Sequence, residues 1–380
     1  MVFVMQTKQE TKQVAKPLRV VFVGGFLGAG KTTLVGQLAE NYTKKGLKVG
    51  ILTNDAAQNL VDTQNLKGKG FAVEEVSGSC YCCAFDKMLD QIEKLSKFQP
   101  DILLLEPIGS CTDLIATVLE PIKRLHATQF KATPYMVLVD PKRAQQMLSP
   151  QAEGFPKNTA YIYDKQLEEA DVIVVNKIDN TPKQVVDEVV ALLQKKYPGR
   201  RVLTASAQTG DGLNEILSIC ESDKNIGLNL LPELDYDVYA DGEAELGWLN
   251  SSVKLTATTP FDLGELLLNV LDQVSTRLKS QKAEIAHIKA IASVDAKPAA
   301  LANITKTGSG AELHQATTYR VSNAEITFNA RAIIDPEKLS HVIEECLSDE
   351  CKKRGARYQI SALHYLRPGR PEPIYRFKKQ

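Results

Sequence analysis

The sequence predicts two domains: a larger α/β domain built on a mainly parallel, doubly wound sheet, and a smaller α+β domain after it. Three observations predict this organisation. The chain has 380 residues, which is more than one typical domain holds. From about residue 18 to 220, short runs rich in Val, Ile and Leu alternate with helical patterns, as in doubly wound folds. Beyond residue 247 the predicted order is β-α-β-β-α-β, which is typical of a ferredoxin-like domain.

Seven apolar runs are expected as strands of the parallel sheet. They cover residues 18–24, 48–54, 71–76, 101–106, 135–140, 171–176 and 201–206. Because apolar and polar residues hardly alternate within them, we expect both faces of this sheet to be buried. The stretches between them, such as residues 31–46 and 181–199, carry apolar residues three and four positions apart and end in Gly, which favours amphipathic helices.

The domain boundaries follow from changes in pattern. We expect a disordered leader at residues 1–16, the α/β domain at 17–220, an acidic, turn-rich linker at 221–247 and the second domain at 248–380. The elements expected in the second domain are strands at 248–258, 284–294, 324–334 and 357–366, with helices at 262–281 and 336–355. The leader has too short an apolar run for a signal peptide.

Composition limits the classes of partner. The chain has 46 basic and 46 acidic residues, so its formal net charge is zero, which argues against a broad nucleic-acid or membrane-surface role. No apolar run approaches the roughly 20 residues that span a bilayer. The seven cysteines are odd in number and are not spaced like a disulfide framework. We therefore expect a soluble, cytoplasmic protein with reduced thiols.

A phosphate-binding loop follows the first predicted strand. Gly25-x-x-x-x-Gly30-Lys31-Thr32 lies between a strand and a helix, which is the context that identifies a P-loop. Lys31 would contact the β- and γ-phosphates, and the Thr32 hydroxyl would bind Mg²⁺. The expected nucleotide-binding residues of this loop are Gly25, Gly28, Ala29, Gly30, Lys31, Thr32 and Thr33.

Two later stretches predict which base is bound. Asn176-Lys177-Ile178-Asp179 ends a predicted strand, and the Asp179 carboxylate can accept two parallel hydrogen bonds from guanine N1–H and its 2-amino group. Adenine offers no such pair, so a buried carboxylate would be left unsatisfied. Ser206-Ala207 follows the last strand, where backbone N–H groups could donate to guanine O6. The sequence therefore predicts GTP rather than ATP, and the first domain is expected to be a P-loop GTPase domain.

Five stretches of the sequence point to one known family: the P-loop, "NKID", "SAQTGDGL", the cluster of three cysteines and "LLLEPIG". Together they resemble the CobW-like GTPases, which are relatives of HypB and UreG. The resemblance covers most of residues 18–215. It implies a GTP-dependent metallochaperone, and it matches Glu106-Pro107-Ile108-Gly109 to the family's Glu-x-x-Gly. The catalytic residues expected on this basis are Lys31, Thr32, Glu106 and Asp55.

The stretch after the second strand departs from the family pattern. The family has Asn-Asp/Glu-Phe-Gly-Glu followed by an Asp, whereas residues 54–58 here read "NDAAQ", with Asp62 further on. We expect Asp55 or Asp62 to approach Mg²⁺, directly or through water, the alternative being a solvated carboxylate. Gln58 would orient the attacking water. Because no arginine is in evidence near this stretch, a metal or a partner is expected to assist hydrolysis.

Three interpretations compete for Cys80, Cys82 and Cys83: buried structural residues, a redox pair, or metal ligands. Clustering beside polar Gly78 and Ser79 argues against the first, and the spacing is too tight for the usual Cys-x-x-Cys device. Three thiolates favour Zn²⁺, or Co²⁺ or another divalent transition metal, and the family's Cys-x-Cys-Cys binds metal.

Cys111 is a candidate fourth ligand. Gly-Ser-Cys occurs at residues 78–80 and again at 109–111, after strands expected to be near neighbours. The alternative is that Cys111 packs in the core. The five histidines are expected as surface or packing residues; they are His126, His287, His314, His341 and His364.

The sequence thus predicts GTP-gated delivery of a divalent metal, or of a metal cofactor, to a client metalloprotein, with Mg²⁺ assisting GTP hydrolysis. Two alternatives remain at this point. One is a GTP-binding regulatory protein whose cysteines hold a structural zinc, and the other is a GTPase chaperone for a corrinoid-dependent enzyme. No nucleic-acid or membrane partner is expected, and homodimer formation is left open.

Overall fold

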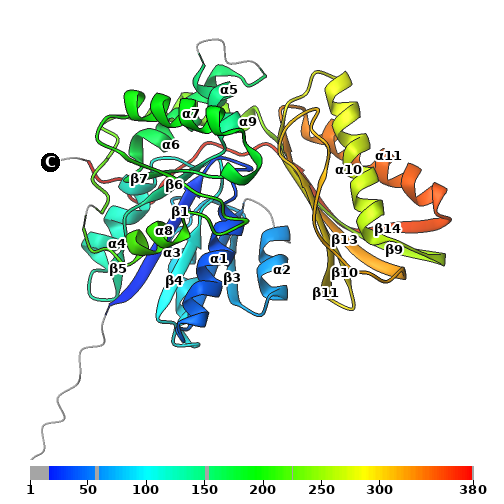
Figure 1. Cartoon of the computed structure of the whole chain (residues 1–380), viewed down its shortest axis with the longest axis horizontal. Helices are drawn as coiled ribbons and strands as arrows, with labels where there is room; N and C mark the ends of the chain where they lie inside the picture. Colours follow the sequence, from blue (N-terminus) through cyan, green and yellow to red (C-terminus); the bar gives the residue numbers. More distant parts are fainter. Residues whose placement is uncertain (1–16, 56–59, 150–153, 225, 379–380) are drawn as a thin grey trace, which may run out of the picture.

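A computed structural model describes residues 17–55, 60–149, 154–224 and 226–378. Two sheets, one in each half of the chain, lie beside one another (Figure 1). The predicted leader at residues 1–16 and the predicted role of Gln58 fall outside the described residues. Within the described ranges, no helix is both long enough and apolar enough to cross a membrane.

The first sheet has eight strands in the order β3-β2-β4-β1-β6-β7-β8, with β5 paired to β1. Every pairing in it is parallel. Its strands are β1 Leu18–Gly25, β2 Val49–Asp55, β3 Ala72–Ser77, β4 Ile102–Glu106, β5 Phe130–Ala132, β6 Met136–Val139, β7 Val172–Val175 and β8 Arg201–Thr204. All seven expected strands are present, and the predicted parallel α/β class is confirmed.

Helices cover both faces of this sheet. Along β1, Val20 and Phe22 contribute to the core on one face, while Val21 and Val23 contribute to the core on the other. This explains the continuous apolar runs in the sequence. The helices are α1 Lys31–Lys44, α2 Val61–Gly68, α3 Phe85–Ser96, α4 Glu120–Leu125, α5 Pro141–Leu148, α6 Lys157–Glu169, α7 Lys183–Lys196, α8 Leu213–Cys220 and α9 Tyr236–Ala244, with short turns η1 Ile115–Leu119 and η2 Ile178–Asn180.

The second sheet is antiparallel and has six strands in the order β12-β11-β10-β13-β9-β14. Its elements are β9 Gly247–Phe261, α10 Leu263–Ser280, β10 Ile285–Val294, β11 Lys297–Ile304, β12 Glu312–Ala316, β13 Val321–Ala332, α11 Pro336–Lys353 and β14 Ala356–Leu366. The four expected strands are adjacent, and β11 and β12, which were not predicted, extend the sheet beyond β10. An antiparallel second domain is confirmed, while its ferredoxin-like assignment stays a prediction.

Helices α10 and α11 cover one face of the second sheet, and the other face meets the first domain at α2 (Figure 1). The Val61 N–H at the start of α2 donates to Asn329 Oδ1 at 2.7 Å. An ion pair joins the domains beside it: both Nη2 contacts from Arg331 to the Asp55 carboxylate are 2.8 Å long. The Arg331 guanidinium is 4% exposed and stacks 4.0 Å from the Trp248 ring. Buried polar contacts therefore fix how the domains meet.

Two segments outside the sheets pack on the first domain. Residues 221–247, expected as a linker, contain α9, which packs against α6. Residues 367–378 leave β14 and run back across the first domain towards the C-terminal end marked in Figure 1. We call residues 370–378 the C-terminal strap. The predicted domain boundaries stay a prediction.

The Arg331–Asp55 ion pair leads to a stability prediction. Arg331→Met removes the bidentate partner of a half-buried carboxylate, which should lower the free energy of unfolding by about 3 kcal/mol. The measurement is the midpoint of urea unfolding, with Lys254→Met, an exposed cation on the same sheet, as control. Adding Asp55→Asn should recover much of the loss. An unchanged midpoint in Arg331→Met would show that the ion pair does not stabilise the docked domains.

Candidate functional site

The loop between β1 and α1 has the backbone that a P-loop needs. Gly25 and Gly30 have φ values of 127° and 97°, which side chains rarely tolerate. A Cβ at Gly25 would also lie 2.4 Å from Leu138 O, and one at Gly30 would lie 2.3 Å from Asn176 Nδ2. Helix α1 follows without a side-chain cap, so its first N–H groups are left for a ligand. The arrangement suits an anion.

Three oxygen-bearing side chains gather at the start of α1. The Thr32 hydroxyl donates to Glu106 Oε1 at 2.9 Å, and Asp62 lies near the same hydroxyl. Among the described residues, Glu106 Oε2 is buried and has no hydrogen-bond partner. Burial and, next, the charge of Asp62 raise the pKa of Glu106 to about 7. Burial alone would raise the pKa of Asp62, but the ammonium of Lys289 lowers it below its usual value.

These groups fit a magnesium ion. Carboxylate and hydroxyl oxygens are the ligands that Mg²⁺ prefers, and the unpartnered Glu106 Oε2 is available as one. The structure therefore brings together Thr32, Glu106 and Asp62. Asp55, which the sequence offered beside Asp62, instead holds Arg331 and does not line the cavity described below. Arg331 reaches this stretch from the second domain, but it is paired with Asp55 and is not among the residues that line the cavity.

The residues expected to recognise the base lie at the ends of β7 and β8. The Asn176 amide joins two loops, because Nδ2 donates to Ala29 O at 2.8 Å and Oδ1 accepts from Ala207 N at 2.9 Å. Lys177 has a positive φ of 60° and pairs with Asp140 at 2.8 Å. The Asp179 carboxylate is exposed and would be free to meet a base at one oxygen, because the other accepts from Ser206 Oγ at 2.7 Å.

The proposed donors to guanine O6 are already engaged within the chain. The Ala207 N–H donates to Asn176, and the Ser206 N–H donates to Asp211 O at 2.9 Å. A guanine O6 at this position would therefore need one of these groups to change partner, or a neighbouring donor such as the side chain of Gln208, which lines the cavity.

A cavity of about 450 Å³ connects these groups and lies between the two domains. Its first-domain wall includes residues of the P-loop, Glu106, and Asn176, Lys177, Asp179 and Asn180. Its other wall is the second sheet, contributing His287, Lys289, Leu301, Asn303, Thr305, Glu312, Leu313, His314 and Gln315. Sequence reasoning missed this wall. His287 and His314, expected as surface or packing residues, line the cavity, and no motif marks them.

The cysteine loop connects β3 to α3. Cys80 Sγ lies 2.8 Å from Cys82 Sγ, and Cys82 Sγ lies 3.7 Å from Cys83 Sγ. The three sulfurs lie within 4.8 Å of one another, and all are free thiols. Cys80 and Cys82 are buried and Cys83 is half-buried. One metal ion could contact all three sulfurs, as the metal interpretation requires.

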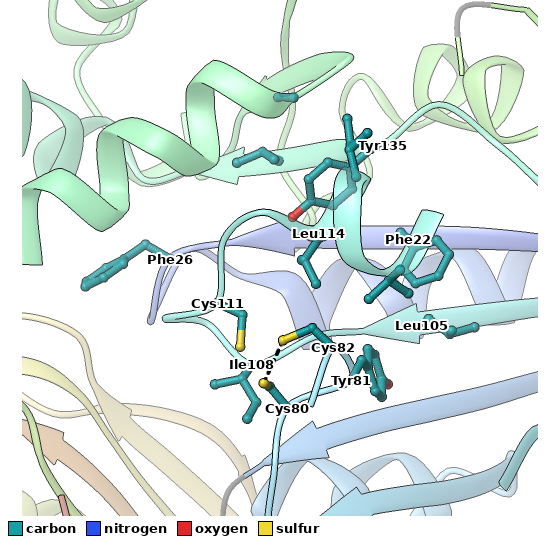
Figure 2. Close-up of a cluster of buried hydrophobic side chains, with 14 of the residues drawn as sticks. Phe22, Phe26, Cys80, Tyr81, Cys82, Leu105, Ile108, Cys111, Leu114 and Tyr135 are labelled. Carbon is teal, nitrogen blue, oxygen red and sulfur yellow. Dashed lines mark hydrogen bonds between the residues drawn. The ribbon is translucent and has the colours of Figure 1, made fainter. Parts of the chain in front are cut away.

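Cys111 approaches this cluster from the loop after β4. Its sulfur points towards Cys80 and Cys82 in Figure 2, although the side chain does not belong to the tight group of three. The strands before the two loops are not adjacent, because β2 lies between β3 and β4. The loops nevertheless converge at the carboxyl edge of the sheet. Cys111 is 2% exposed, so its position fits both a fourth ligand and a core residue.

Electrostatics single out Cys80 as the first thiolate of the group. Hydrogen bonds from Cys111 and then Cys82 lower the pKa of Cys80 well below its usual value. The same contacts raise the pKa values of Cys82 and Cys111, since each loses its proton only beside an existing negative charge. A thiolate surrounded by thiols suits a soft or borderline cation such as Zn²⁺.

Two neighbours hold the cysteine loop in place. The Asn54 amide, at the end of β2, donates to Ser79 O at 2.7 Å and accepts from Tyr81 N at 3.0 Å. The C-terminal strap covers the other side: the Glu372 N–H donates to Cys83 Sγ at 3.1 Å, and the Ile374 N–H donates to Cys82 O at 3.0 Å. The loop is therefore clamped between β2 and a segment from the far end of the chain.

The segment Glu106–Cys111 links the P-loop to the sulfurs. Its first residue accepts from Thr32, and its last points at the cysteine cluster (Figure 2). Between them, a Cβ at Gly109 would lie 3.0 Å from Lys31 Nζ, so the segment passes directly against the P-loop lysine. Gln166 Nε2 fixes its course by donating to Gly109 O at 2.9 Å and to Cys111 O at 2.8 Å.

Residues 19–204 match the family described as CobW/HypB/UreG, nucleotide-binding domain. The chain carries a CobW/HypB/UreG domain. The resemblance expected from the motifs is confirmed, and at the level of this family it supports a nucleotide-binding GTPase domain.

The individual relatives that match this chain have low sequence identity to it. The zinc chaperone YjiA of Escherichia coli K12 is 31% identical over 100 residues, which are 24% of this chain and 31% of that protein. The zinc chaperone CobW of Pseudomonas aeruginosa is 26% identical over 257 residues, covering 60% of this chain and 64% of that one. A crystal structure of hydrogenase maturation factor HypB from Archaeoglobus fulgidus, 19% identical, aligns with a TM-score of 0.39 over 54% of this chain and 89% of that one. The chain spans less than two thirds of the length of both zinc chaperones.

The raised pKa of Glu106 predicts a pH effect on stability without nucleotide. A carboxyl whose pKa is about 7 when folded and 4.5 as its ordinary value keeps a proton on folding. Its contribution to stability is complete below pH 4.5 and is lost as the pH rises through about 7. Glu106→Gln should therefore lose less stability than the parent between pH 5 and 8, by roughly 3 kcal/mol.

The measurement is the free energy of urea unfolding at several pH values. Glu93→Gln, an exposed residue of α3, is the matched control and should follow the parent. Parallel pH profiles for the parent and Glu106→Gln would contradict the assignment of this titration to Glu106.

Proposed function

We propose that this protein is a GTP-hydrolysing metallochaperone. It binds GTP with Mg²⁺ in the cavity between the domains, binds a divalent metal on the thiolates of the cysteine loop, and delivers that metal or a metal cofactor to a client protein. The single observation that carries the proposal is the segment Glu106–Cys111, which contacts the P-loop at one end and faces the cysteine cluster at the other.

The residues at the start of α1 and around Glu106 support the GTP-binding part of the proposal. Lys31 and the uncapped N-terminus of α1 bind phosphate, and Thr32, Glu106 and Asp62 hold Mg²⁺. The ion supplies positive charge at the phosphates. When the γ-phosphate leaves, the contacts of Thr32 and Glu106 change first. Because Cys111 lies five residues further along the same segment, that change reaches the sulfurs through a short, buried stretch of backbone.

The metal part follows from ligand chemistry. Cys80, Cys82 and Cys83 provide three sulfurs, and Cys111 would complete a tetrahedral set. The number of sulfurs that bind the ion would then change between three and four with the bound nucleotide. With three sulfurs the site would release its ion to an incoming ligand, and with four it would retain the ion. Zn²⁺ is the first choice, since relatives are named zinc chaperones. The thiols must stay reduced, as they do in the cytoplasm.

One observation favours the alternative of a GTP-binding regulatory protein with a structural zinc. Cys80 and Cys82 are 9% and 1% exposed, and the C-terminal strap lies against the loop. Closed sites of this kind usually hold zinc permanently. The two functions differ in whether bound metal exchanges with nucleotide state.

Base recognition is tested by Asp179→Asn. An amide offers one acceptor and one donor where guanine needs two acceptors, so affinity for GTP should fall at least about tenfold. Xanthine carries an oxygen where guanine carries its 2-amino group, so xanthosine triphosphate should bind the variant better than the parent. Titration with each nucleotide provides the affinities, and Asp187→Asn, an exposed residue on α7, is the control. Unchanged GTP affinity would remove Asp179 from the base site.

Metal delivery is tested by the rate at which bound Zn²⁺ passes to a chromogenic chelator. With GTP and with GDP the parent should release zinc at rates that differ at least about tenfold, which is about 1.4 kcal/mol in barrier height. Cys82→Ser should weaken zinc binding in both states, while Cys220→Ala, a buried cysteine outside the loop, should not. Equal release rates in GTP and GDP would favour the structural zinc. Failure to bind Zn²⁺, Co²⁺ or any other divalent transition metal would refute both functions.

A further inference from the structure

The second domain places a lysine at the phosphate end of the cavity. Lys289 lies on β10, and its ammonium contacts both oxygens of Asp62, one of them at 2.6 Å. Lys31, Thr32, Asp62 and Glu106 line the same cavity as Lys289. Lys289 therefore lies at the end of the cavity that holds the four groups proposed to bind phosphate and Mg²⁺.

Polar side chains surround Lys289 on the same wall. His287 is two residues earlier on β10, so it points to the same side of the sheet, and Asn303 is the direct partner of Lys289 on β11. All three line the cavity. Among the described residues, His287 Nε2 and Asn303 Oδ1 are buried and have no hydrogen-bond partner. Unsatisfied buried polar atoms are costly, so a row of them aimed into one cavity points to a polar ligand.

We propose that Lys289 is a phosphate-binding residue, through which the second domain supplies positive charge to the transition state of GTP hydrolysis. The proposal rests on the proposed GTPase function. In the reaction, water attacks the γ-phosphorus, the bond from that phosphorus to the β–γ bridging oxygen breaks, and GDP, inorganic phosphate and one proton result. Negative charge grows on the bridging and β-phosphate oxygens. An ammonium at this position offsets it, as arginines do in other P-loop enzymes.

A plain interdomain salt bridge is the competing explanation. It would account for the contact with Asp62, but the docked domains are already joined by Arg331 with Asp55 and by Asn329 with Val61. It also leaves the unpartnered atoms of His287 and Asn303 without a role. Lys289 remains 17% exposed through the cavity, whereas Arg331 is 4% exposed. A cation that faces a cavity can meet a ligand there.

The test is a double-mutant cycle in the full chain with Lys289→Met and Asp62→Asn. The measured quantities are kcat for GTP hydrolysis and the affinities for GDP and for GDP with aluminium fluoride, which mimics the transition state. Lys289→Met should lower kcat about 100-fold and weaken the mimic by a similar factor, while GDP affinity changes less than about fivefold. Lys254→Met, an exposed lysine of the same sheet, should match the parent.

The effect of Lys289→Met in the Asp62→Asn variant distinguishes phosphate binding by Lys289 from a plain interdomain salt bridge. If Lys289 binds phosphate, adding Lys289→Met to Asp62→Asn should still cost about the same factor in kcat. If Lys289 only neutralises Asp62, that further loss should vanish, and the proposal is overturned. Retained GDP binding shows that a slow variant is folded. A parent that binds no guanine nucleotide would refute the GTPase function itself, whereas a parent that turns over GTP as fast as Lys289→Met refutes only the role of Lys289.

Discussion

Two aspartates at the boundary between the domains each take a cation from the second domain, and the functional architecture depends on these contacts. Asp55 is held by Arg331 and Asp62 by Lys289. A carboxylate removed from water is strongly unfavourable without such a partner, so the second sheet has to dock where the strands of the first sheet end. That docking places the second sheet against the sheet edge and forms the cavity. Both domains therefore line the proposed nucleotide site.

The parallel sheet explains why a nucleotide and a metal can share this edge. Strands β1, β2, β3 and β4 all end there, so the P-loop, Asn54, the cysteine loop and Glu106 are brought together although they are distant in sequence. Side chains join these loops, as Thr32 does with Glu106 and Asn54 with the cysteine loop. In the proposed function, a displacement at Thr32 would be transmitted along Glu106–Cys111, because this segment is buried and closely packed.

The elements that could be predicted from the sequence are those whose residues are contiguous. The P-loop and the Cys-x-Cys-Cys loop each depend on local backbone geometry, and the alternation of buried strands and amphipathic helices gave the parallel sheet. Contacts that depend on the register between strands could not be predicted from the sequence. Asn303 meets Lys289 only because β11 pairs with β10, and nothing in residues 297–316 announces those strands, since every residue of β12 is exposed and no alternation arises. Helix α9 was missed because its amphipathic pattern is weak and includes Gly242, although Asp235 caps its start.

The C-terminal strap is synthesised long after the cysteine loop that it covers. The strap contacts Cys83 across 289 positions of sequence, so the loop leaves the ribosome long before its cover is made. At about 5 to 20 residues per second, that interval is roughly 15 to 60 s. Until then, the contacts that the strap makes with Cys82 and Cys83 cannot form. If the cluster binds metal as proposed, an ion can reach it before this cover is in place.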